Sequence, residues 1–368
     1  MNVPRIEAFD LADWVIDFAS GVQHNLTNSS IKTPLLSEMG IRVDYDQFQR
    51  KRQSFRGALK RTIAHTYDVP EDSVLVTCSG SEAIFLAVGS TIQTGDEAIV
   101  TTPSYAPTYQ IPHLFGAQVK YVRSHLEDGF QPDVTRLSEA ISTRTRLVIL
   151  TNSNNPAGCM INGKLVQEIL EIAGDSNVIV DEAFREFGFK NAPPIGATLR
   201  ENCLSLGTMS KFYGVEDLRI GWILAKKELI ERARKLKNWV TIENSVFSEM
   251  IACKVLEERA RFVARARRFY DENVALVENW IRTRDELEWV KPNAGLICFP
   301  KFGMPISSVE LGRKLLDEHG VAIGPGAFFN AEGHFRLCFT RTREEVREAL
   351  AALGRGLDYI LETAIKAS

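Results

Sequence analysis

One lysine in this chain stands among hydroxyl side chains, and an arginine lies eight residues after it. Residues 205–214 read SLGTMSKFYG, in which Lys211 follows a short apolar run, and Arg219 lies in the next segment, LRIGW. An amine in such a place can form an imine with a carbonyl compound, and the arginine beside it can bind a phosphate. Taken alone, the segment is equally typical of a surface lysine in a strand-to-helix turn.

Three other segments place polar groups just after apolar runs. Asp181 ends the run VIV, at the edge where open α/β sheets bind ligands. An aspartate there can keep a pyridine nitrogen protonated, which makes a pyridoxal ring an electron sink. Asn155 follows another run and can donate to a phenolate oxygen. Gly80 and Ser81 open a helix whose free N–H groups can hold a phosphate, although this turn alone is typical of a plain capped helix start.

The elements that position these residues are read from the spacing of apolar residues. Short apolar runs alternate with helical segments from about residue 70 to about residue 225, which predicts βα units on a mostly parallel sheet. The runs are 74–76, 97–100, 119–122, 147–150, 178–180, 203–206 and 220–224. A charged amphipathic stretch, 226–282, predicts one or two long helices. Short strands at 296–299, 321–323 and 335–339, followed by a helix from about Arg343, predict a smaller α+β domain.

Composition excludes several classes of protein. The chain has 368 residues, 45% of them apolar, with 44 Lys and Arg against 47 Asp and Glu, so it lacks the basic surplus of nucleic-acid binders. No stretch approaches 18 uncharged apolar residues and the start has no apolar signal segment, so neither a membrane span nor secretion is predicted. Six single cysteines without a C-x-x-C pair predict no disulfide framework, no metal site and a cytoplasmic protein.

Together these motifs resemble the fold type I pyridoxal-phosphate enzymes, the class I/II aminotransferase family, over roughly residues 40–360. The order is the family's: phosphate turn, aromatic residue, asparagine, aspartate, lysine and distal arginine. The resemblance implies an α/β fold of the PLP-dependent transferase type, a mostly parallel central sheet flanked by helices with a smaller α+β domain. It implies pyridoxal 5′-phosphate as the cofactor, an amino acid as the small-molecule substrate and a homodimer. The predicted divisions are a segment near the active site that belongs to the small domain (1–40), a large cofactor domain (41–250) and a small C-terminal domain (251–368).

The resemblance also assigns roles to single residues. Lys211 resembles the Schiff-base lysine, Asp181 the partner of the ring nitrogen and Asn155 the donor to the ring hydroxyl. Tyr105 resembles the aromatic residue that stacks on the ring, and Arg336 in FRL the arginine that pairs with a substrate α-carboxylate. The residues that resemble the phosphate ligands are Gly80, Ser81, Thr208, Ser210 and Arg219. Tyr45 resembles, over a poorly matching segment, the tyrosine that such dimers lend to the neighbouring subunit's phosphate.

Two features bear on the reaction, which in this family passes through an external aldimine and a quinonoid. Phe184 stands where the family commonly has a tyrosine, so one donor to the ring hydroxyl is missing, as in the decarboxylase and cyclase branches. The N-terminal segment resembles that of the capreomycidine synthase and hydroxyarginine cyclase branch. There Glu7 can pair with a guanidinium and His24 can protonate a departing hydroxyl, so both are predicted as catalytic and substrate-binding residues. A surface glutamate and a satisfied loop histidine explain them equally well.

The leading hypothesis is therefore a cyclase or lyase that dehydrates a hydroxylated arginine and closes a cyclic guanidine amino acid of the capreomycidine or enduracididine type. An aminotransferase that exchanges an amino group with a 2-oxo acid is the alternative, and an amino acid decarboxylase is a third route. A cofactor-binding regulatory protein without turnover is disfavoured because the chain lacks a helix-turn-helix domain. Residues 158–165, GCMINGKL, fit a phosphate loop except at Leu165, so no ATP site is predicted.

Overall fold

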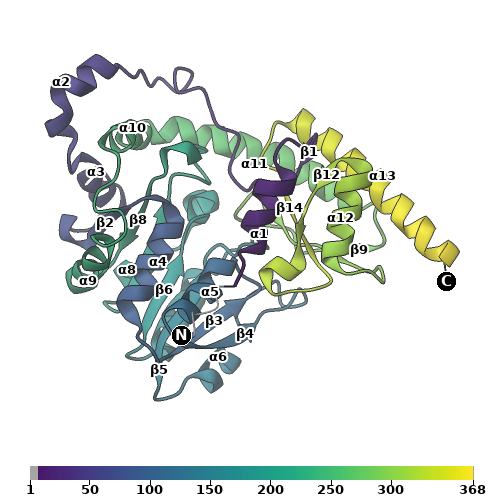
Figure 1. The fold of residues 1–368 in the computed structure, drawn as a ribbon, viewed down its shortest axis with the longest axis horizontal. Coiled ribbons are helices and arrows are strands. Elements are labelled where there is room, and N and C mark those ends of the chain that lie inside the picture. Colours follow the sequence, from purple (N-terminus) through teal and green to yellow (C-terminus); the bar gives the residue numbers. More distant parts are fainter. Residues whose placement is uncertain (1–6, 368) are drawn as a thin grey trace, which may run out of the picture.

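A seven-stranded sheet forms the centre of the larger part of the molecule, as the computed structural model of residues 7–367 shows (Figure 1). The strands run in the order β2-β8-β7-β6-β5-β3-β4, and β8 alone is antiparallel to its neighbours in this sheet. They are β2 (Val74–Thr77), β3 (Glu97–Thr102), β4 (Gln118–Arg123), β5 (Thr145–Thr151), β6 (Asn177–Asp181), β7 (Cys203–Thr208) and β8 (Gly221–Leu224). All seven predicted strands and the mostly parallel sheet are confirmed.

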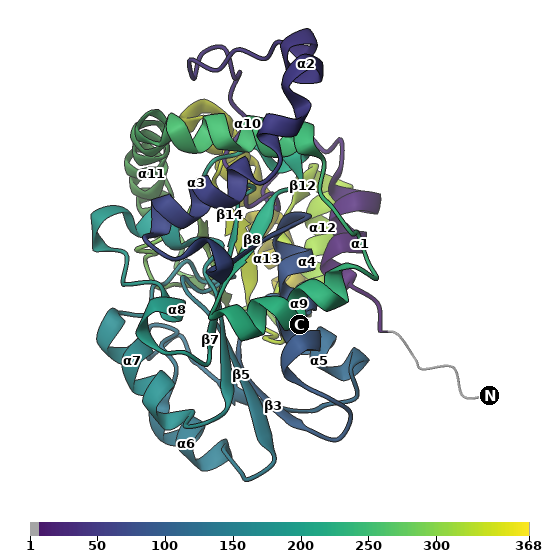
Figure 2. The same cartoon turned by 90° about the vertical axis from the view of Figure 1, so that its left-hand side faces the viewer.

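Helices cover both faces of this sheet, which is why its strands read as continuous apolar runs. On β5, Ile149 packs with α4, α5 and α9, whereas Val148 and Leu150 pack with α6 and α7 on the opposite face. Figure 2 shows the sheet between these two groups of helices. They are α4 (Ser79–Thr91), α5 (Ala106–Leu114) and α9 (Lys227–Lys237) on one face, and α6 (Val134–Ala140) and α7 (Gly163–Ile172), followed by the short α8 (Gly196–Leu199), on the other.

The stretch 226–282 forms three helices, so the prediction of one or two is wrong. They are α9, α10 (Val246–Glu257) and α11 (Arg259–Ile281). A loop separates the first two, and Ser245 then caps α10 by accepting a hydrogen bond from Ser248 N at 3.3 Å. The backbone of Glu258 leaves the helical region, and α11 begins after it. Two earlier helices, α2 (Tyr45–Phe55) and α3 (Ala58–Tyr67), contact α10.

Short strands and two helices form a second, smaller part (Figure 1). Its strands are β9 (Leu287–Glu288), β10 (Ile297–Cys298), β11 (Lys301–Phe302), β12 (Val321–Ala322), β13 (Gly324–Pro325) and β14 (Phe335–Cys338). Its helices are α12 (Ser308–His319) and α13 (Arg343–Ala367), and β10, β14 and β13 form an antiparallel sheet. The predicted α+β pattern after residue 289 is confirmed. Shorter 3-10 turns occur at Glu71–Ser73, Arg185–Asn191, Glu216–Leu218 and Gly326–Phe329.

The N-terminal segment packs against the C-terminal elements. Helix α1 (Asp10–Asp13) continues into a π-helical turn, Trp14–Ala19, and β1 (His24–Asn25) pairs in parallel with β12. Leu26 donates its N–H to Ala322 O and accepts from Cys338 N, both at 2.9 Å. These contacts join the segment to the C-terminal strands, and its assignment to the small domain stays a prediction. The domain boundaries at residues 40 and 250 also stay predictions. Residues 1–6 of the first predicted division and residue 368 of the last lie outside the described residues.

Three sequence expectations concern features outside the core. No helix in residues 7–367 is both long and apolar enough to cross a membrane. Within the same residues, no group of three or more His, Cys, Asp or Glu side chains is arranged to hold a metal ion. The six cysteines are free thiols, five of them buried. A cytoplasmic location stays a prediction.

Glu97 at the start of β3 gives a pH-dependent contribution to stability. Its carboxylate is 1% exposed, accepts a hydrogen bond from Ser142 Oγ at 2.6 Å, lies 2.7 Å from Lys120 Nζ and pairs with Arg144. The hydrogen bonds from Lys120 and Ser142 lower the pKa of Glu97 from 4.5 to about 2. Because the folded pKa is the lower one, this stabilisation is present above about pH 4.5 and lost as the pH falls toward 2.

We therefore expect Glu97→Gln to lower the free energy of unfolding at neutral pH by about 1–3 kcal/mol, the usual contribution of hydrogen bonds to a charged group. The difference from wild type should shrink as the pH is lowered below the ordinary glutamate value. Urea unfolding at a series of pH values measures it. Glu139→Gln, an exposed change on α6, is the control. A deficit for Glu97→Gln that stays constant down to acid pH would contradict the assignment.

Candidate active site

One cavity of about 320 Å³ brings together all ten residues that were predicted to bind the cofactor or the α-carboxylate within their own subunit. It lies at the carboxyl ends of the central parallel strands, where an open α/β sheet binds ligands. Asp181 ends β6, Thr208 ends β7 and Asn155 follows β5. The ten lining residues are Gly80, Ser81, Tyr105, Asn155, Asp181, Thr208, Ser210, Lys211, Arg219 and Arg336. Motifs that are far apart in the chain therefore meet at one site.

Asp181 is a desolvated carboxylate that fits a cationic ring nitrogen. It is 6% exposed, and Ala183 N donates to its Oδ1 at 3.0 Å. Burial raises the pKa of Asp181 to about 6, although the Ala183 N–H and the nearby Lys211 act in the opposite direction. A buried carboxylate is stabilised most by a charged hydrogen-bond donor, which a protonated pyridine nitrogen supplies.

Lys211 has the environment of a reactive amine. Its Nζ donates to Ser29 Oγ at 3.0 Å, and no carboxylate of the described residues lies within 4.0 Å of it. Burial lowers the pKa of Lys211, and the positive charge of Arg336 lowers it further. A larger fraction of the amine is then neutral, which is the form that attacks a carbonyl carbon.

Arg336 has one guanidinium nitrogen without a hydrogen-bond partner among the described residues. It is 3% exposed, its Nη1 donates to Asn155 Oδ1 at 3.0 Å and its Nη2 donates to Thr27 O at 2.7 Å. The guanidinium lies 4.8 Å from the centre of the Phe329 ring. Its Nε is buried and has no hydrogen-bond partner among the described residues. A buried guanidinium held from two sides, with a donor left over, is well suited to a carboxylate.

Hydroxyl groups, a helix start and an arginine line one part of the cavity and offer hydrogen-bond donors that suit a phosphate. The 13-residue helix α4 begins at Ser79, so the free N–H groups of its first turn lie at the cavity. Thr208 Oγ1 donates to Ser210 Oγ at 3.1 Å, and Arg219 Nη1 donates to Glu216 O at 3.1 Å. Ser79 and Arg219 have φ angles of 81° and 52°, a left-handed conformation that is costly for non-glycine residues and concentrates at functional sites. These donors match the chemistry of a phosphate dianion.

Two aromatic rings at the cavity suit a flat heteroaromatic ring. Tyr105 precedes α5 and meets Phe9 edge-on, with 5.5 Å between the ring centres. Burial raises the pKa of Tyr105, so its hydroxyl keeps its proton. Phe184 is 2% exposed and stacks on Phe187. At the position where a phenol was expected from the resemblance, the chain thus offers a ring without a donor.

The structure does not bring Glu7 or His24 to this cavity. Glu7 is exposed and precedes α1, and His24 is a half-buried residue of β1, opposite Val321. Neither lines the cavity, so their predicted catalytic and substrate-binding roles lack support from the geometry. The N-terminal segment reaches the cavity elsewhere, through apolar residues of its helical part and through a polar run after β1. The lining residues are Phe9, Leu11, Ala12, Val15, Ile16, Thr27, Asn28 and Ser29.

Sequence reasoning also missed Glu216, which lines the cavity on the turn between Lys211 and Arg219. The sequence signal was an acidic residue between two residues with predicted roles. Three more polar lining residues that were not predicted, Thr27, Asn28 and Ser29, lie in the run TNSS, which begins three residues after His24. A run of amides and hydroxyls in a segment expected to cross the active site was therefore a better guide than the single histidine.

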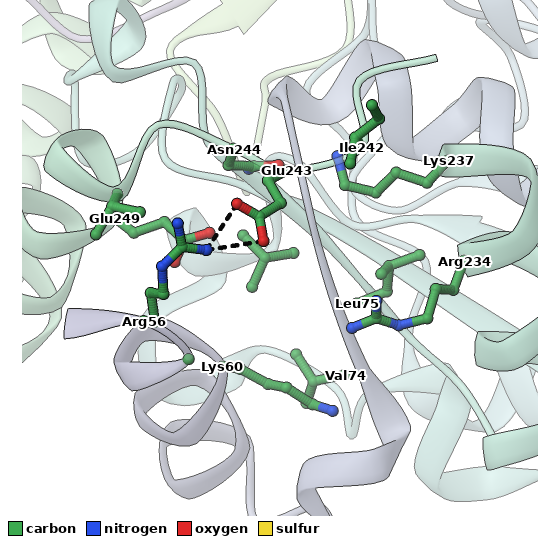
Figure 3. Close-up of a pocket in the computed structure, with 13 residues that line it drawn as sticks. Arg56, Lys60, Val74, Leu75, Arg234, Lys237, Ile242, Glu243, Asn244 and Glu249 are labelled. Atoms are coloured by element: carbon green, nitrogen blue, oxygen red, sulfur yellow. Dashed lines mark hydrogen bonds and ion pairs between the residues drawn. The ribbon is translucent and has the colours of Figure 1, made fainter. Parts of the chain in front are cut away.

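A second cavity lies away from these residues and is shown in Figure 3. It is formed by α3, β2, α9 and the loop before α10, and Arg56 donates two hydrogen bonds to Glu243 across it, at 2.8 and 2.7 Å. None of the predicted site residues lines it. Tyr45, at the start of α2, is 58% exposed and also lies outside the active-site cavity. Its predicted role toward a neighbouring subunit stays a prediction.

A lysine, an aspartate and donors that suit a phosphate, together at the carboxyl edge of this sheet, define a pyridoxal-phosphate-dependent enzyme of fold type I. The sequence model of aminotransferase class I and II matches residues 36–353, and the chain belongs to this family. Pyridoxal 5′-phosphate is accordingly its cofactor, and the donor set described above fits that group.

Known proteins of more than one activity are similar to this chain. Capreomycidine synthase of Streptomyces vinaceus is 27% identical, over 96% of this chain and 94% of its own. An aspartate aminotransferase of Pyrococcus horikoshii is also 27% identical, over 79% of this chain and 77% of its own. A PLP-dependent aminotransferase structure from Streptococcus suis superposes with a TM-score of 0.90 at 25% identity, covering 97% and 99% of the two chains.

Proposed function

We propose that this enzyme removes water from a hydroxylated L-arginine and closes a cyclic guanidine amino acid. The observation that carries the proposal is Phe184, a buried ring where a donor to the cofactor's ring oxygen was expected. Loss of that donor raises the basicity of the oxygen. In the resemblance, a phenylalanine at this position is a feature of the decarboxylase and cyclase branches. Similarity to capreomycidine synthase supports the proposal, because it extends over 96% of the chain, whereas similarity to the Pyrococcus aminotransferase extends over 79%.

The roles proposed for the chain's own residues follow from their contacts. When bound, pyridoxal phosphate supplies an electron sink for the reaction at the substrate's Cα. Arg336 binds the α-carboxylate through its free Nε, while Asn155 and Thr27 O keep its fork in place. Lys211 Nζ takes the proton from Cα, and burial keeps that amine ready to accept it.

The bond changes balance without an oxidant or a second substrate. With a hydroxyl on the carbon next to Cα, the Cα–H and C–O bonds break, and hydroxide leaves with one proton as water. A guanidine N–H then adds to that carbon, forming the ring C–N bond, and Cα regains a proton. The product has the substrate's nitrogen count and is lighter by one water. Lys211 Nζ is the group placed to carry the Cα proton in both directions.

An aminotransferase is the second candidate, favoured by the similarity to aspartate aminotransferases. In that reaction Lys211 and Arg336 keep the same roles, and a 2-oxo acid is the second substrate. The cavity argues against an acidic amino acid as the donor. Its basic lining residues among those described are Lys211, Arg219 and Arg336, each with a role already, so this chain offers no further cation for a second carboxylate.

Product analysis distinguishes the candidates. The holoenzyme is incubated with arginine, hydroxyarginines and a panel of common amino acids, with and without a 2-oxo acid, and products are identified by mass spectrometry. We expect a hydroxyarginine to lose one water without any 2-oxo acid. Strict dependence on the 2-oxo acid, with a new amino acid as product, would overturn the cyclase in favour of the aminotransferase. A product lighter by carbon dioxide would identify a decarboxylase.

The family also suggests a homodimer, which we include in the proposal. Three apolar side chains of the loop between α9 and α10 support it, since they are exposed in the single chain. Trp239 is 89% exposed, Val240 51% and Ile242 67%. Exposed apolar groups gathered in one loop are typical of a protein–protein contact.

A further inference from the structure

One carboxylate at the active-site cavity has no role toward the cofactor. Glu216 begins the 3-10 turn Glu216–Leu218 and lines the cavity together with Lys211 and Arg336. Ser30 Oγ donates to its Oε2 at 2.6 Å, and Asn28 Nδ2 donates to its Oε1 at 3.3 Å. Both donors belong to the N-terminal segment, so the carboxylate is held in place before any substrate binds.

Among the described residues Glu216 has no cationic partner, whereas three other glutamates of low exposure have one. Glu82 pairs with Lys237, Glu97 with Lys120, and Glu186 with Arg259. No lysine, arginine or histidine nitrogen of the described side chains is found within 4.0 Å of the Glu216 carboxylate. A partly buried carboxylate in a ligand cavity, held by two neutral donors and without a counter-ion, is a binding group for a cation.

The other charged groups of the cavity already have partners in the proposed function. Arg219 faces the phosphate, Asp181 the ring nitrogen and Arg336 the α-carboxylate, and Lys211 is the covalent and proton-carrying group. We propose that Glu216 binds the cationic side chain of the substrate, a guanidinium or an ammonium group. This inference rests on the proposed function in its assignment of the cavity, but it names the class of substrate, a basic amino acid, independently of which reaction follows.

Glu216 lines the same cavity as Lys211 and Arg336, so one bound substrate can contact all three residues. Burial lowers the pKa of Lys211, the charge of Arg336 lowers it further and the charge of Glu216 raises it, so both charges act on the same amine. A substrate whose amino nitrogen lies at Lys211 and whose carboxylate lies at Arg336 therefore occupies the same cavity as the Glu216 carboxylate. Each oxygen of Glu216 accepts one hydrogen bond from the protein and keeps a further lone pair, so the pair of oxygens can accept two N–H groups of one guanidinium edge.

The first test uses the wild-type holoenzyme and does not depend on any variant. It is titrated with L-arginine and with L-citrulline, in which an uncharged carbamoyl group replaces the guanidinium, without a 2-oxo acid. Dissociation constants are taken from the change in the cofactor's absorption. We expect arginine to bind about tenfold tighter or more, the ratio typical of a hydrogen bond to a charged partner. Equal affinity for the two would overturn the inference.

The second test removes the charge while retaining hydrogen bonding. Glu216→Gln keeps an acceptor for Ser30 or Asn28, and we expect it to weaken arginine binding about tenfold while leaving citrulline nearly unchanged. The affinity ratio then approaches one. Asp217→Asn is the matched control, because Asp217 is the next residue of the same turn, exposed and outside the cavity lining. A Glu216→Gln enzyme that keeps the wild-type ratio would overturn the inference.

Failure of this inference differs from failure of the proposed function. Where Glu216 controls the preference for arginine but hydroxyarginine only transaminates, the inference stands and the cyclase is rejected. Where hydroxyarginine loses water but Glu216→Gln keeps the arginine preference, the cyclase stands and Glu216 is not the recognition group. The two readouts, an affinity ratio and a product mass, are obtained independently.

Discussion

Replacing Lys211 by alanine is expected to abolish turnover and the borohydride-fixable form of the cofactor. Lys211 Nζ is the amine of the cavity with a lowered pKa, and it lies beside Ser29, Arg336 and the ends of β6 and β7. Its loss removes both the covalent attachment and the proton carrier at Cα, so the rate should fall by at least about 10⁴-fold, the upper range for a positioned proton-transfer group.

Visible absorption and mass spectrometry of the borohydride-treated protein measure this effect. In the wild type the cofactor should be fixed on the peptide that contains Lys211, and in Lys211→Ala no peptide should carry it. Lys227→Ala is the control, since Lys227 is an exposed residue of α9 with only a surface ion pair to Asp72. Cofactor fixed on a different lysine of the wild type would refute the assignment of Lys211.

Asp181→Asn is expected to have the second largest effect, a fall in turnover of about 10²–10³-fold, the usual loss when one preorganised charged partner is removed. The carboxylate is buried, and its charged form is the one that keeps a ring nitrogen protonated. Asparagine has nearly the same shape and still accepts a hydrogen bond from Ala183 N, so the fold should persist. Lys211 remains, and the cofactor should still be fixed by borohydride.

The matched control for Asp181→Asn is Glu182→Gln, a change at the neighbouring carboxyl group. Glu182 is 8% exposed and lies outside the cavity lining, where it accepts a hydrogen bond from Gly196 N at 3.4 Å. Burial raises the pKa of Glu182 to about 7, so glutamine reproduces its protonated form. Steady-state rates of Asp181→Asn and Glu182→Gln should therefore differ by about 10²–10³-fold, with the Glu182→Gln enzyme close to the wild type. Similar rates in the two variants would mean that Asp181 has no role at the cofactor ring.

The fold could be predicted from the sequence where burial alone determines which residue types a segment contains. The strands of the central sheet are buried on both faces, so their apolar runs were visible in the sequence. Asp181 and Lys211 follow such runs, and the carboxyl ends of parallel strands meet at one edge, so their convergence was predictable. The antiparallel direction of β8 was not, because strand direction depends on the connections and leaves no mark on the composition of Gly221–Leu224.

The N-terminal half of the site could not be predicted in the same way. Strand β1 has only two residues, so its sequence shows no periodicity. Nothing in the sequence therefore indicates whether the His24 side chain faces the cavity. Glu216 precedes Asp217, and two adjacent acids are typical of a solvated turn. Only the hydrogen bonds from Asn28 and Ser30, nearly two hundred residues earlier in the chain, distinguish Glu216 from its neighbour.

The hydrogen bonds of Leu26 also determine when, during synthesis of the chain, the active-site cavity can form. Leu26 lies between Ala322 and Cys338, and the adjacent Thr27 O accepts from Arg336, 309 residues away in the sequence. During translation Leu26 and Thr27 thus leave the ribosome long before Ala322, Arg336 and Cys338, the residues to which they are hydrogen-bonded. Contacts of such sequence separation form slowly. The central sheet can form early during synthesis, but the active-site cavity is complete only after β14, which carries Arg336, has been synthesised.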